Sequence, residues 1–218
     1  MPQLFKPSTN GKTQMLLAAI CALVLAGAAV AFMLNSSPYS TGESRIAQQP
    51  VPFSHQHHVG ELGIQCGYCH TSFTRSPFAG MPDTATCMTC HSQLYTSADV
   101  LAPVRKSFTD EQPLAWVRVH DLPDHVYFSH QAHVNNGVGC ESCHGRVDRM
   151  PLMRQAKPLS MRWCLECHRN PGPQLREISQ ITVMGIARAT GSSAATQALL
   201  NKYDIHPKRM TDCMTCHR

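Results

Sequence analysis

The stretch that decides the fold is Phe128–Gly145, which reads FSHQAHVNNGVGCESCHG. It closes on Cys140-Glu-Ser-Cys143-His144, two cysteines three residues apart followed directly by a histidine. The chain holds 11 cysteines, and all but Cys21 fall into five copies of this Cys-x-x-Cys-His pattern. A pattern that takes up nearly every cysteine indicates one chemistry repeated five times.

That chemistry is the attachment of c-type haem. Two thiols add to the haem vinyl groups, and the histidine that follows them ligates the iron. Residues three and four apart on one helical turn share a face, so both sulfurs and the imidazole can meet one porphyrin. The sequence predicts five covalently bound haem c groups. The predicted attachment residues are Cys66, Cys69, Cys87, Cys90, Cys140, Cys143, Cys164, Cys167, Cys213 and Cys216, and the predicted proximal ligands are His70, His91, His144, His168 and His217.

Zinc and disulfide chemistry fit the cysteines less well. A structural zinc site takes four ligands, so it would draw on two cysteine pairs, and it gives no reason for a histidine after every pair. A disulfide framework explains neither the constant spacing nor the histidine. We therefore rank both far below haem attachment.

Length and composition favour a fold in which haem is the core. Residues 53–218 supply only about 33 residues per predicted haem, and 6% of the whole chain is aromatic, which is too little protein to cover five rings and build a separate core. We expect a mostly irregular fold with short α-helices and almost no sheet. Dense covalent attachment supplies the constraint that small scaffolds need.

An internal repeat points to the distal iron ligands. The units FSHQHHV (53–59) and FSHQAHV (128–134) each precede a haem motif, with one residue fewer before the motif in the second copy. Histidines three apart on one turn point in neighbouring directions, so each unit would hold two adjacent haems. The repeat predicts four distal ligands, His55, His58, His130 and His133.

The fifth distal ligand stays open at this stage. His120 is the first choice, and His206, seven residues before Cys213, is the second. Methionine is a competitor, because a Met/His pair raises the haem potential, although filling a gap in packing is its commoner role. His57 and His125 are read as solvated or packing residues. The candidate methionines are Met150, Met153, Met161 and Met184.

The N-terminal segment predicts a membrane anchor. Residues 15–34 carry no charge over 20 positions, enough for a helix to cross a bilayer. Lys6 and Lys12 precede this run, and the next basic residue is Arg45, so the positive-inside rule puts the haem region outside the cytoplasm. A cleaved signal peptide is the alternative, but the apolar run is longer than a typical signal core.

These patterns divide the chain into four parts. We expect a cytoplasmic tail (1–14), a transmembrane helix (15–34), a flexible linker (35–52) and an extracytoplasmic five-haem domain (53–218). Within that domain the repeat predicts two di-haem modules, 53–95 and 116–172, and a tail haem in 200–218. Cys21 lies inside the anchor and is read as a small apolar side chain.

The net charge of +5 does not indicate a nucleic-acid partner. Each haem would add two propionates, which are ionised at neutral pH as other carboxyls are, so five haems reverse the sign. Some arginines are expected to pair with these propionates. The candidates are Arg146, Arg149, Arg154, Arg162, Arg169 and Arg176.

The stretches between the haem motifs carry a family resemblance. MPQLFKPSTN, VHDLPDHVYFSHQAHV, GCESCHGRVDRM, PLSMRWCLECHRNP and the closing CMTCHR resemble the pentahaem cytochrome c subunit of bacterial alternative complex III, a quinol-oxidising respiratory or photosynthetic complex. Its fold would consist of di-haem modules of the class III, c7-like kind. A related pentahaem subunit of other molybdopterin-type membrane oxidoreductases has similar stretches.

The resemblance implies a place in a membrane complex. Its partners would be integral-membrane quinol-binding subunits, an iron-sulfur or molybdopterin-like periplasmic subunit, and a monohaem cytochrome c or another periplasmic acceptor. The chain would be anchored in the bacterial inner membrane with its haem domain in the periplasm, and it would pass on electrons from menaquinol.

No acid, base or nucleophile is required of this chain, because the cofactors carry the redox chemistry and the protein sets ligation and spacing. The alternatives are a reductase with one open iron position, a tethered quinol dehydrogenase with its own quinol pocket, and a tethered electron carrier. The surplus of histidines argues against the first of these.

Overall fold

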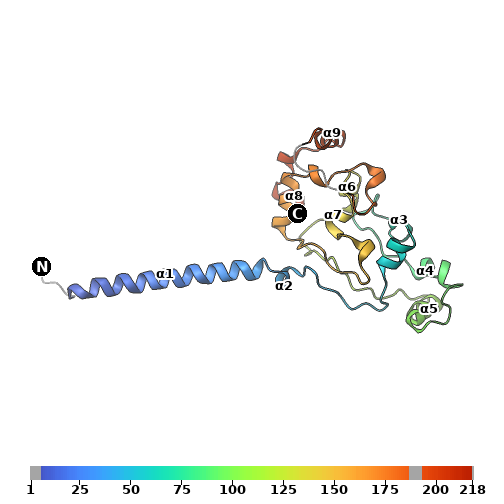
Figure 1. Cartoon of the computed structure of the whole chain (residues 1–218), viewed down its shortest axis with the longest axis horizontal. Coiled ribbons are helices and arrows are strands. Elements are labelled where there is room, and N and C mark those ends of the chain that lie inside the picture. The colour runs from blue at the N-terminus through green and yellow to red at the C-terminus, as the bar shows by residue number, and fades with distance from the viewer. Residues whose placement is uncertain (1–5, 187–192, 218) are drawn as a thin grey trace. The chain divides into compact units, whose positions relative to one another are not determined.

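The computed structural model describes residues 6–186 and 193–217, and the chain divides into two compact units, Met1–Gly42 and Glu43–Arg218 (Figure 1). The first unit contains helices α1 (Pro7–Asn35) and α2 (Pro38–Thr41). Gly42 ends α2 in the left-handed conformation, with φ of 74°, which glycine adopts without a steric penalty.

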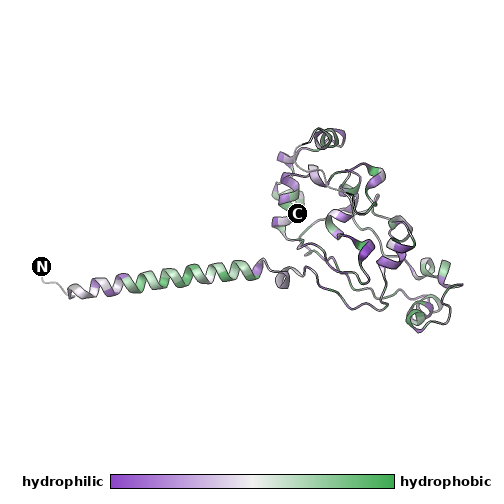
Figure 2. Ribbon diagram, in the orientation of Figure 1, coloured by the Kyte–Doolittle hydropathy of each residue, from purple (hydrophilic) through white to green (hydrophobic). Residues whose placement is uncertain are grey.

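Helix α1 is apolar along most of its length (Figure 2). Its large hydrophobic side chains are exposed rather than packed against protein, and 29 residues give a length of about 43 Å. By length and composition this helix can cross a membrane, although a signal sequence near an N-terminus has the same properties. The predicted span, residues 15–34, lies within it.

The second unit consists of short helices and long connections. Its α-helices are α3 (Cys66–Cys69), α4 (Thr84–His91), α5 (Ala102–Thr109), α6 (His130–Val134), α7 (Glu141–His144), α8 (Met161–Arg169), α9 (Ala194–Lys202) and α10 (Cys213–Cys216). Tighter or wider turns are η1 (Gln56–Glu61, a π-helical turn), η2 (Asp99–Leu101), η3 (Val147–Arg149), η4 (Gly172–Gln174), η5 (Ile178–Gln180) and η6 (Pro207–Arg209).

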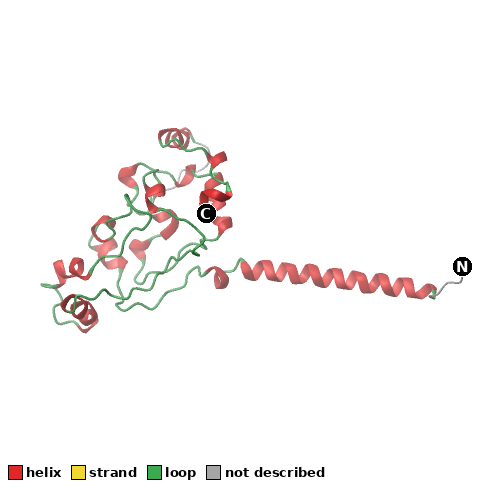
Figure 3. Ribbon diagram, turned by 180° about the vertical axis from the view of Figure 1, so that it is seen from behind, coloured by secondary structure: helices red, strands yellow, loops and turns green. Residues whose placement is uncertain are grey.

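The described residues form no strand, as Figure 3 shows, and pair only in two isolated bridges, Ile46 with Arg154 and Val138 with Leu175. The predicted fold class, mostly irregular with short helices, is confirmed.

Side-chain caps start several of these helices. Asp83 accepts a 2.8 Å hydrogen bond from the Thr86 amide at the start of α4. Ser160 and Ser193 cap α8 and α9 in the same way. Such caps satisfy amide groups that a short helix leaves without partners, and each stabilises the helix by about 1 kcal/mol. Helices α4, α8 and α9 therefore begin where the sequence supplies Asp or Ser.

The hydrocarbon core of the described protein is small. Its buried hydrophobic side chains are Val51, Val104, Val134, Val147, Met150, Leu175 and Ile181. None of these is aromatic, and no described side chain is both large and fully buried. A unit of this length normally encloses a larger apolar interior, which fits the expectation that haem supplies most of it.

Residues 43–52, expected to be part of a flexible linker, belong to the second unit. The Gln49 side chain makes two hydrogen bonds to the Val117 backbone, donating to its carbonyl at 2.8 Å and accepting from its amide at 2.9 Å. Val51 is buried, and Ile46 pairs with Arg154. The segment is held in place by these contacts.

Candidate haem sites

Each of the five motifs forms one short helical turn. We number them in chain order as site I (Cys66–His70), site II (Cys87–His91), site III (Cys140–His144), site IV (Cys164–His168) and site V (Cys213–His217). In sites I, III and V the histidine amide donates to the carbonyl of the first cysteine at 2.9–3.0 Å. The turn thus brings both thiols and the imidazole to one side of the backbone.

Hydrogen bonds at Nδ1 fix the orientation of four motif histidines. His70 donates to Gly80 O at 2.7 Å, and His168 donates to Met210 O at 2.8 Å. His91 and His217 make the same kind of bond to backbone carbonyls, at 3.2 and 3.0 Å. A ring that donates from Nδ1 leaves its Nε2 lone pair available, which is the arrangement of a metal-ligating histidine.

The Phe-Ser-His units repeat contact by contact. Phe53 stacks on His58 with ring centroids 4.3 Å apart, and Phe128 stacks on His133 at 4.6 Å, both at 27°. The edges of His55 and His130 meet the same phenylalanines at 4.9 and 4.8 Å. Each phenylalanine therefore holds two histidines in a fixed relation.

The serines of the units fix the same histidines from the backbone side. The hydroxyls of Ser54 and Ser129 accept from amides three residues on, which caps the turn. Their carbonyls accept from Nδ1 of His58 at 2.9 Å and of His133 at 2.8 Å. His58 and His133 thus present Nε2 as the motif histidines do.

One difference between the units lies in the helix type. The first unit has one more residue before its motif, and η1 is a π-helical turn where α6 is an α-helix. A π-turn accommodates a single inserted residue. The insertion therefore leaves both histidines in the positions of their counterparts.

Distal candidates face motif histidines at a distance that suits an iron between them. Two imidazoles bound to opposite sides of one metal, with bonds of about 2 Å, have ring centroids roughly 6 Å apart. The distance is 6.2 Å for His58 and His91, and 6.1 Å for His133 and His168.

Sites III and V show a similar spacing between ring centroids, whereas site I is linked to His55 by an electrostatic effect on its pKa. His130 lies 6.2 Å from His144 with the rings 7° from parallel. His125 lies 5.6 Å from His217 at 22°. Burial, with help from the charge of His70, lowers the pKa of His55 to about 4. Nδ1 of His55 is buried without a hydrogen-bond partner.

His120, the first choice for the fifth distal ligand, lies against site III. Its ring centroid is 4.3 Å from that of His144, edge to face. That separation is too short for an iron between the rings. Its Nε2 is buried without a partner, and burial lowers its pKa to about 4.

Sequence analysis did not select His125 as a distal ligand, but the structure places it beside site V. Nothing in its local pattern distinguishes it, because the contact joins residues 92 positions apart: the His125 carbonyl accepts from Nδ1 of His217. The Tyr127 amide also donates to the Cys216 carbonyl at 2.9 Å. Only this long-range pairing identifies His125.

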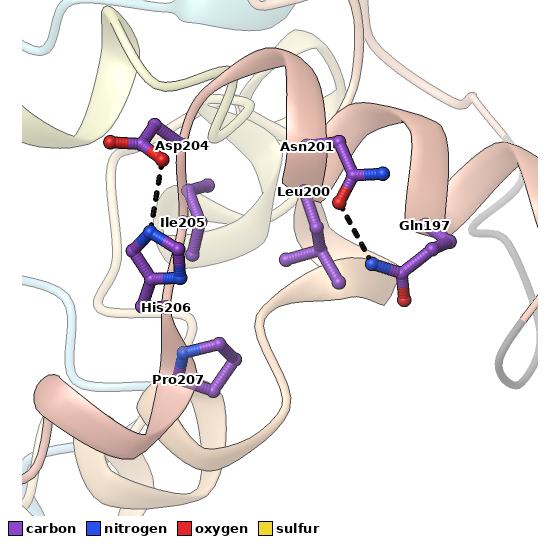
Figure 4. Close-up of a pocket in the computed structure, with 7 residues that line it drawn as sticks. All are labelled: Gln197, Leu200, Asn201, Asp204, Ile205, His206 and Pro207. Atoms are coloured by element: carbon purple, nitrogen blue, oxygen red, sulfur yellow. Dashed lines mark hydrogen bonds and ion pairs between the residues drawn. The ribbon is translucent and has the colours of Figure 1, made fainter.

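The other candidates lie elsewhere. Figure 4 shows His206 in a surface pocket beside α9, where its Nε2 meets Asp204 at 2.9 Å. His57 is half-exposed, and its Nδ1 meets Glu61 at 2.8 Å, which suits the solvated role expected of it. Met184 is half-buried.

The positions of the cysteines do not suit a zinc cluster. All 11 are free. Burial raises the pKa of several of them, most strongly that of Cys140, to about 11. Within the described part of the chain, no group of three or more potential ligands could hold a metal ion. Zinc needs deprotonated thiols in a cluster of four ligands, so the arrangement disfavours it.

Two of the arginines expected near propionates are bound to protein carboxylates. Arg146 makes a bidentate contact with Asp148, and Arg162 meets Glu166 at 3.2 Å. Arg176 is buried beside site III and donates to the Val183 carbonyl at 2.9 Å. Among the arginines that the structure describes, Arg176 is the one that is buried.

The haem motifs, the oriented imidazoles and the small hydrocarbon core together define a multihaem c-type cytochrome. Residues 51–111 and 126–218 match the family described as cytochrome c7 and related cytochrome c. The chain belongs to this family.

One relative with an assigned role is the multiheme cytochrome c subunit of a menaquinone reductase from Nitratidesulfovibrio vulgaris. It is 37% identical over 103 residues, which are 47% of this chain and 48% of the relative. The match therefore spans about half the length of that protein.

Proposed function

We propose that this chain binds five haem c groups and conducts electrons between them. Each haem is held by the two cysteines and the histidine of sites I to V. The observation that carries the proposal is the set of facing imidazoles, 5.6 to 6.2 Å apart at four sites. A histidine on each side of every iron leaves no position open for a substrate.

The proposed distal ligands follow from those pairs. His58 serves site II, His130 serves site III and His133 serves site IV. The repeat predicts these histidines as distal ligands without assigning them to sites. His55 serves site I by analogy with His130, which occupies the same place in the second unit. Nδ1 of His55 is buried without a hydrogen-bond partner. The pairing of His55 with His70 at site I therefore rests on the repeat and on the electrostatic effect of His70 on the pKa of His55.

For site V we propose His125, in the place that sequence analysis gave to His120. The spacing between His125 and His217 suits a shared iron, whereas the ring of His120 is nearest to His144, which already faces His130. His120 is then a half-buried histidine that packs against site III, with its Nε2 buried.

Bound haem supplies reversible one-electron chemistry, and the chain supplies the conditions for it. The backbone carbonyls that accept from Nδ1 keep the imidazoles neutral, oriented and basic. Burial acts in the opposite direction on the pKa and favours the neutral ring, lowering the pKa of His144 to about 3. Histidines held in this state are ready to ligate iron at neutral pH.

We further propose that the chain is the electron-transfer subunit of a menaquinol-oxidising membrane complex of the alternative complex III kind. Three observations support this. They are the family resemblance of the stretches that lie between the haem motifs, the apolar helix α1, and a relative that is named as a subunit of a menaquinone reductase. Helix α1 would anchor the chain, with the haem unit in the periplasm.

The partners in this proposal fall into three groups. Integral-membrane subunits oxidise menaquinol, an iron-sulfur or molybdopterin-like subunit delivers the electrons, and a monohaem cytochrome c or another periplasmic carrier accepts them. The haem unit itself contributes no catalytic group.

Two measurements test the proposal. The haem content of the purified holoprotein, from its mass and its pyridine haemochrome spectrum, should equal five per chain, and the N-terminal segment should still be present. Gentle detergent extraction should bring integral-membrane and iron-sulfur subunits with it. A chain that purifies alone would be a tethered carrier, and quinol oxidation by the isolated chain would make it a quinol dehydrogenase.

A further inference from the structure

The order of the five sites in space differs from their order along the chain, and contacts between sites reveal it. Sites I and II touch directly, because the Tyr68 hydroxyl and the Thr89 hydroxyl form a 2.7 Å hydrogen bond. Both residues lie inside the motifs, between the two cysteines. The proposed distal ligands of these sites, His55 and His58, also lie three residues apart.

Site I is also joined to site III. Helix α6, which carries the proposed distal ligand His130, is fastened to the loop that follows site I. The amide and Nδ1 of His130 both donate to Pro77 O, at 3.0 and 2.9 Å. The Gln131 amide donates to Ser76 O, and the Asn135 side chain donates to Thr74 O at 2.9 Å. Site II makes no such contact with α6 among the interactions found in the described residues.

A second contact confirms that the first module meets site III on the side of η1. The Gln56 amide donates to Met150 O at 3.0 Å. A Cβ on Gly60 would lie 2.2 Å from the Asp148 carbonyl oxygen. Both partners, Met150 and Asp148, follow site III directly, in or beside η3.

Helix α6 joins site III to site IV. His130 faces His144 and His133 faces His168, and the two ligands are three residues apart on one turn. Their Cβ atoms are therefore about 5–6 Å apart. This single turn of helix sets the spacing of the two sites.

Site IV in turn meets site V. Nδ1 of His168 donates to Met210 O at 2.8 Å, three residues before Cys213. The turn just before Met210, η6, packs on α8.

From these contacts, and resting on the proposed function, we infer that the haems form one unbranched row in the order II, I, III, IV, V. Haems II and V are its ends, so electrons enter at one of them and leave at the other. Haem I, first along the chain, is internal and connects the two modules.

Exposure of the attachment cysteines gives an independent indication. Of the ten motif cysteines, Cys90 of site II and Cys213 of site V are exposed, and the other eight are only partly accessible. Met214 at site V and Tyr95, whose ring lies 6.5 Å from that of His91, are also exposed, by 73% and 70%. The ends of the row are thus the sites most open to a redox partner.

Locating the irons in the full holoprotein tests the order directly. Anomalous diffraction at the iron edge should place five irons, each next to one motif histidine. The shortest separations should be II to I, I to III, III to IV and IV to V, and the longest should be II to V. An iron I at one end, or an iron II nearer to iron III than iron I is, would overturn the order. Fewer than five irons would overturn the proposed function and the order with it.

Matched variants supply a second test. Cys66→Ala/Cys69→Ala removes haem I, and Cys87→Ala/Cys90→Ala removes haem II. In electron paramagnetic resonance of the oxidised proteins, loss of haem I should alter the signals of two neighbouring haems, and loss of haem II only one. The opposite result, two signals altered by loss of haem II and one by loss of haem I, is what the chain order requires and would refute the inference.

Discussion

Replacing His125 by alanine should open the sixth coordination position of one haem and leave the other four closed. The His125 ring is the one that faces His217, 5.6 Å away. Three histidines are left without a proposed iron. His120 lies against His144. His57 meets Glu61, and His206 meets Asp204. No second imidazole is therefore available to take over at site V.

The size of the effect follows from the number of sites. One open iron among five corresponds to about 20% of the haem turning high-spin and to about one carbon monoxide bound per reduced chain. The wild-type protein should bind almost none. Both values come from absorption spectra of the purified holoprotein, with total haem as the internal reference.

His120→Ala is the matched control. Both residues are single histidines in the same connection, and only His125 is proposed to ligate iron. The His120 variant should stay fully low-spin, although loss of a buried ring should lower its stability. High-spin haem in the His120 variant, with an unchanged spectrum in the His125 variant, would refute the assignment. Restoration of a low-spin spectrum with a raised potential by His125→Met would support it.

Three further changes probe the scaffold by urea unfolding. Ser129→Ala removes the cap of α6 and should lower the free energy of unfolding by about 1 kcal/mol, with no change expected from Ser129→Thr. Asp148→Asn should lower the free energy of unfolding by roughly 1 kcal/mol. Because Arg146 lowers the pKa of Asp148, this contribution is present at neutral pH and is lost as the pH falls below about 4. A variant as stable as the wild type at pH 7 would contradict this. Gly60→Ala places a Cβ 2.2 Å from the Asp148 carbonyl and should cost on the order of 2 kcal/mol, and an unchanged midpoint would show that the two segments do not touch.

Local patterns were informative where the chemistry is local. The Cys-x-x-Cys-His spacing predicts a turn that gathers two thiols and an imidazole, and the structure has such turns at all five motifs. The Phe-Ser-His units predict paired histidines, and their phenylalanine stacking and serine caps repeat in both copies. The fold class followed from the low aromatic content and the number of motifs.

The sequence was less informative about contacts between distant segments. His125 has no repeat partner and was set aside, while His120 was preferred because it lies upstream of the second module. The segment 43–52 has the composition of a linker, yet Gln49 binds the Val117 backbone. The contacts of His125 with His217 and of Gln49 with Val117 join residues more than sixty positions apart. Composition does not encode such contacts.

The sequence by itself determined that this protein is a multihaem cytochrome, because haem attachment is covalent and its residues must lie within one turn of helix. The tertiary structure alone decided which imidazoles face each other and which sites are neighbours. An iron joins two histidines through space, so its second ligand is fixed by how the connections fold around it rather than by any spacing along the chain.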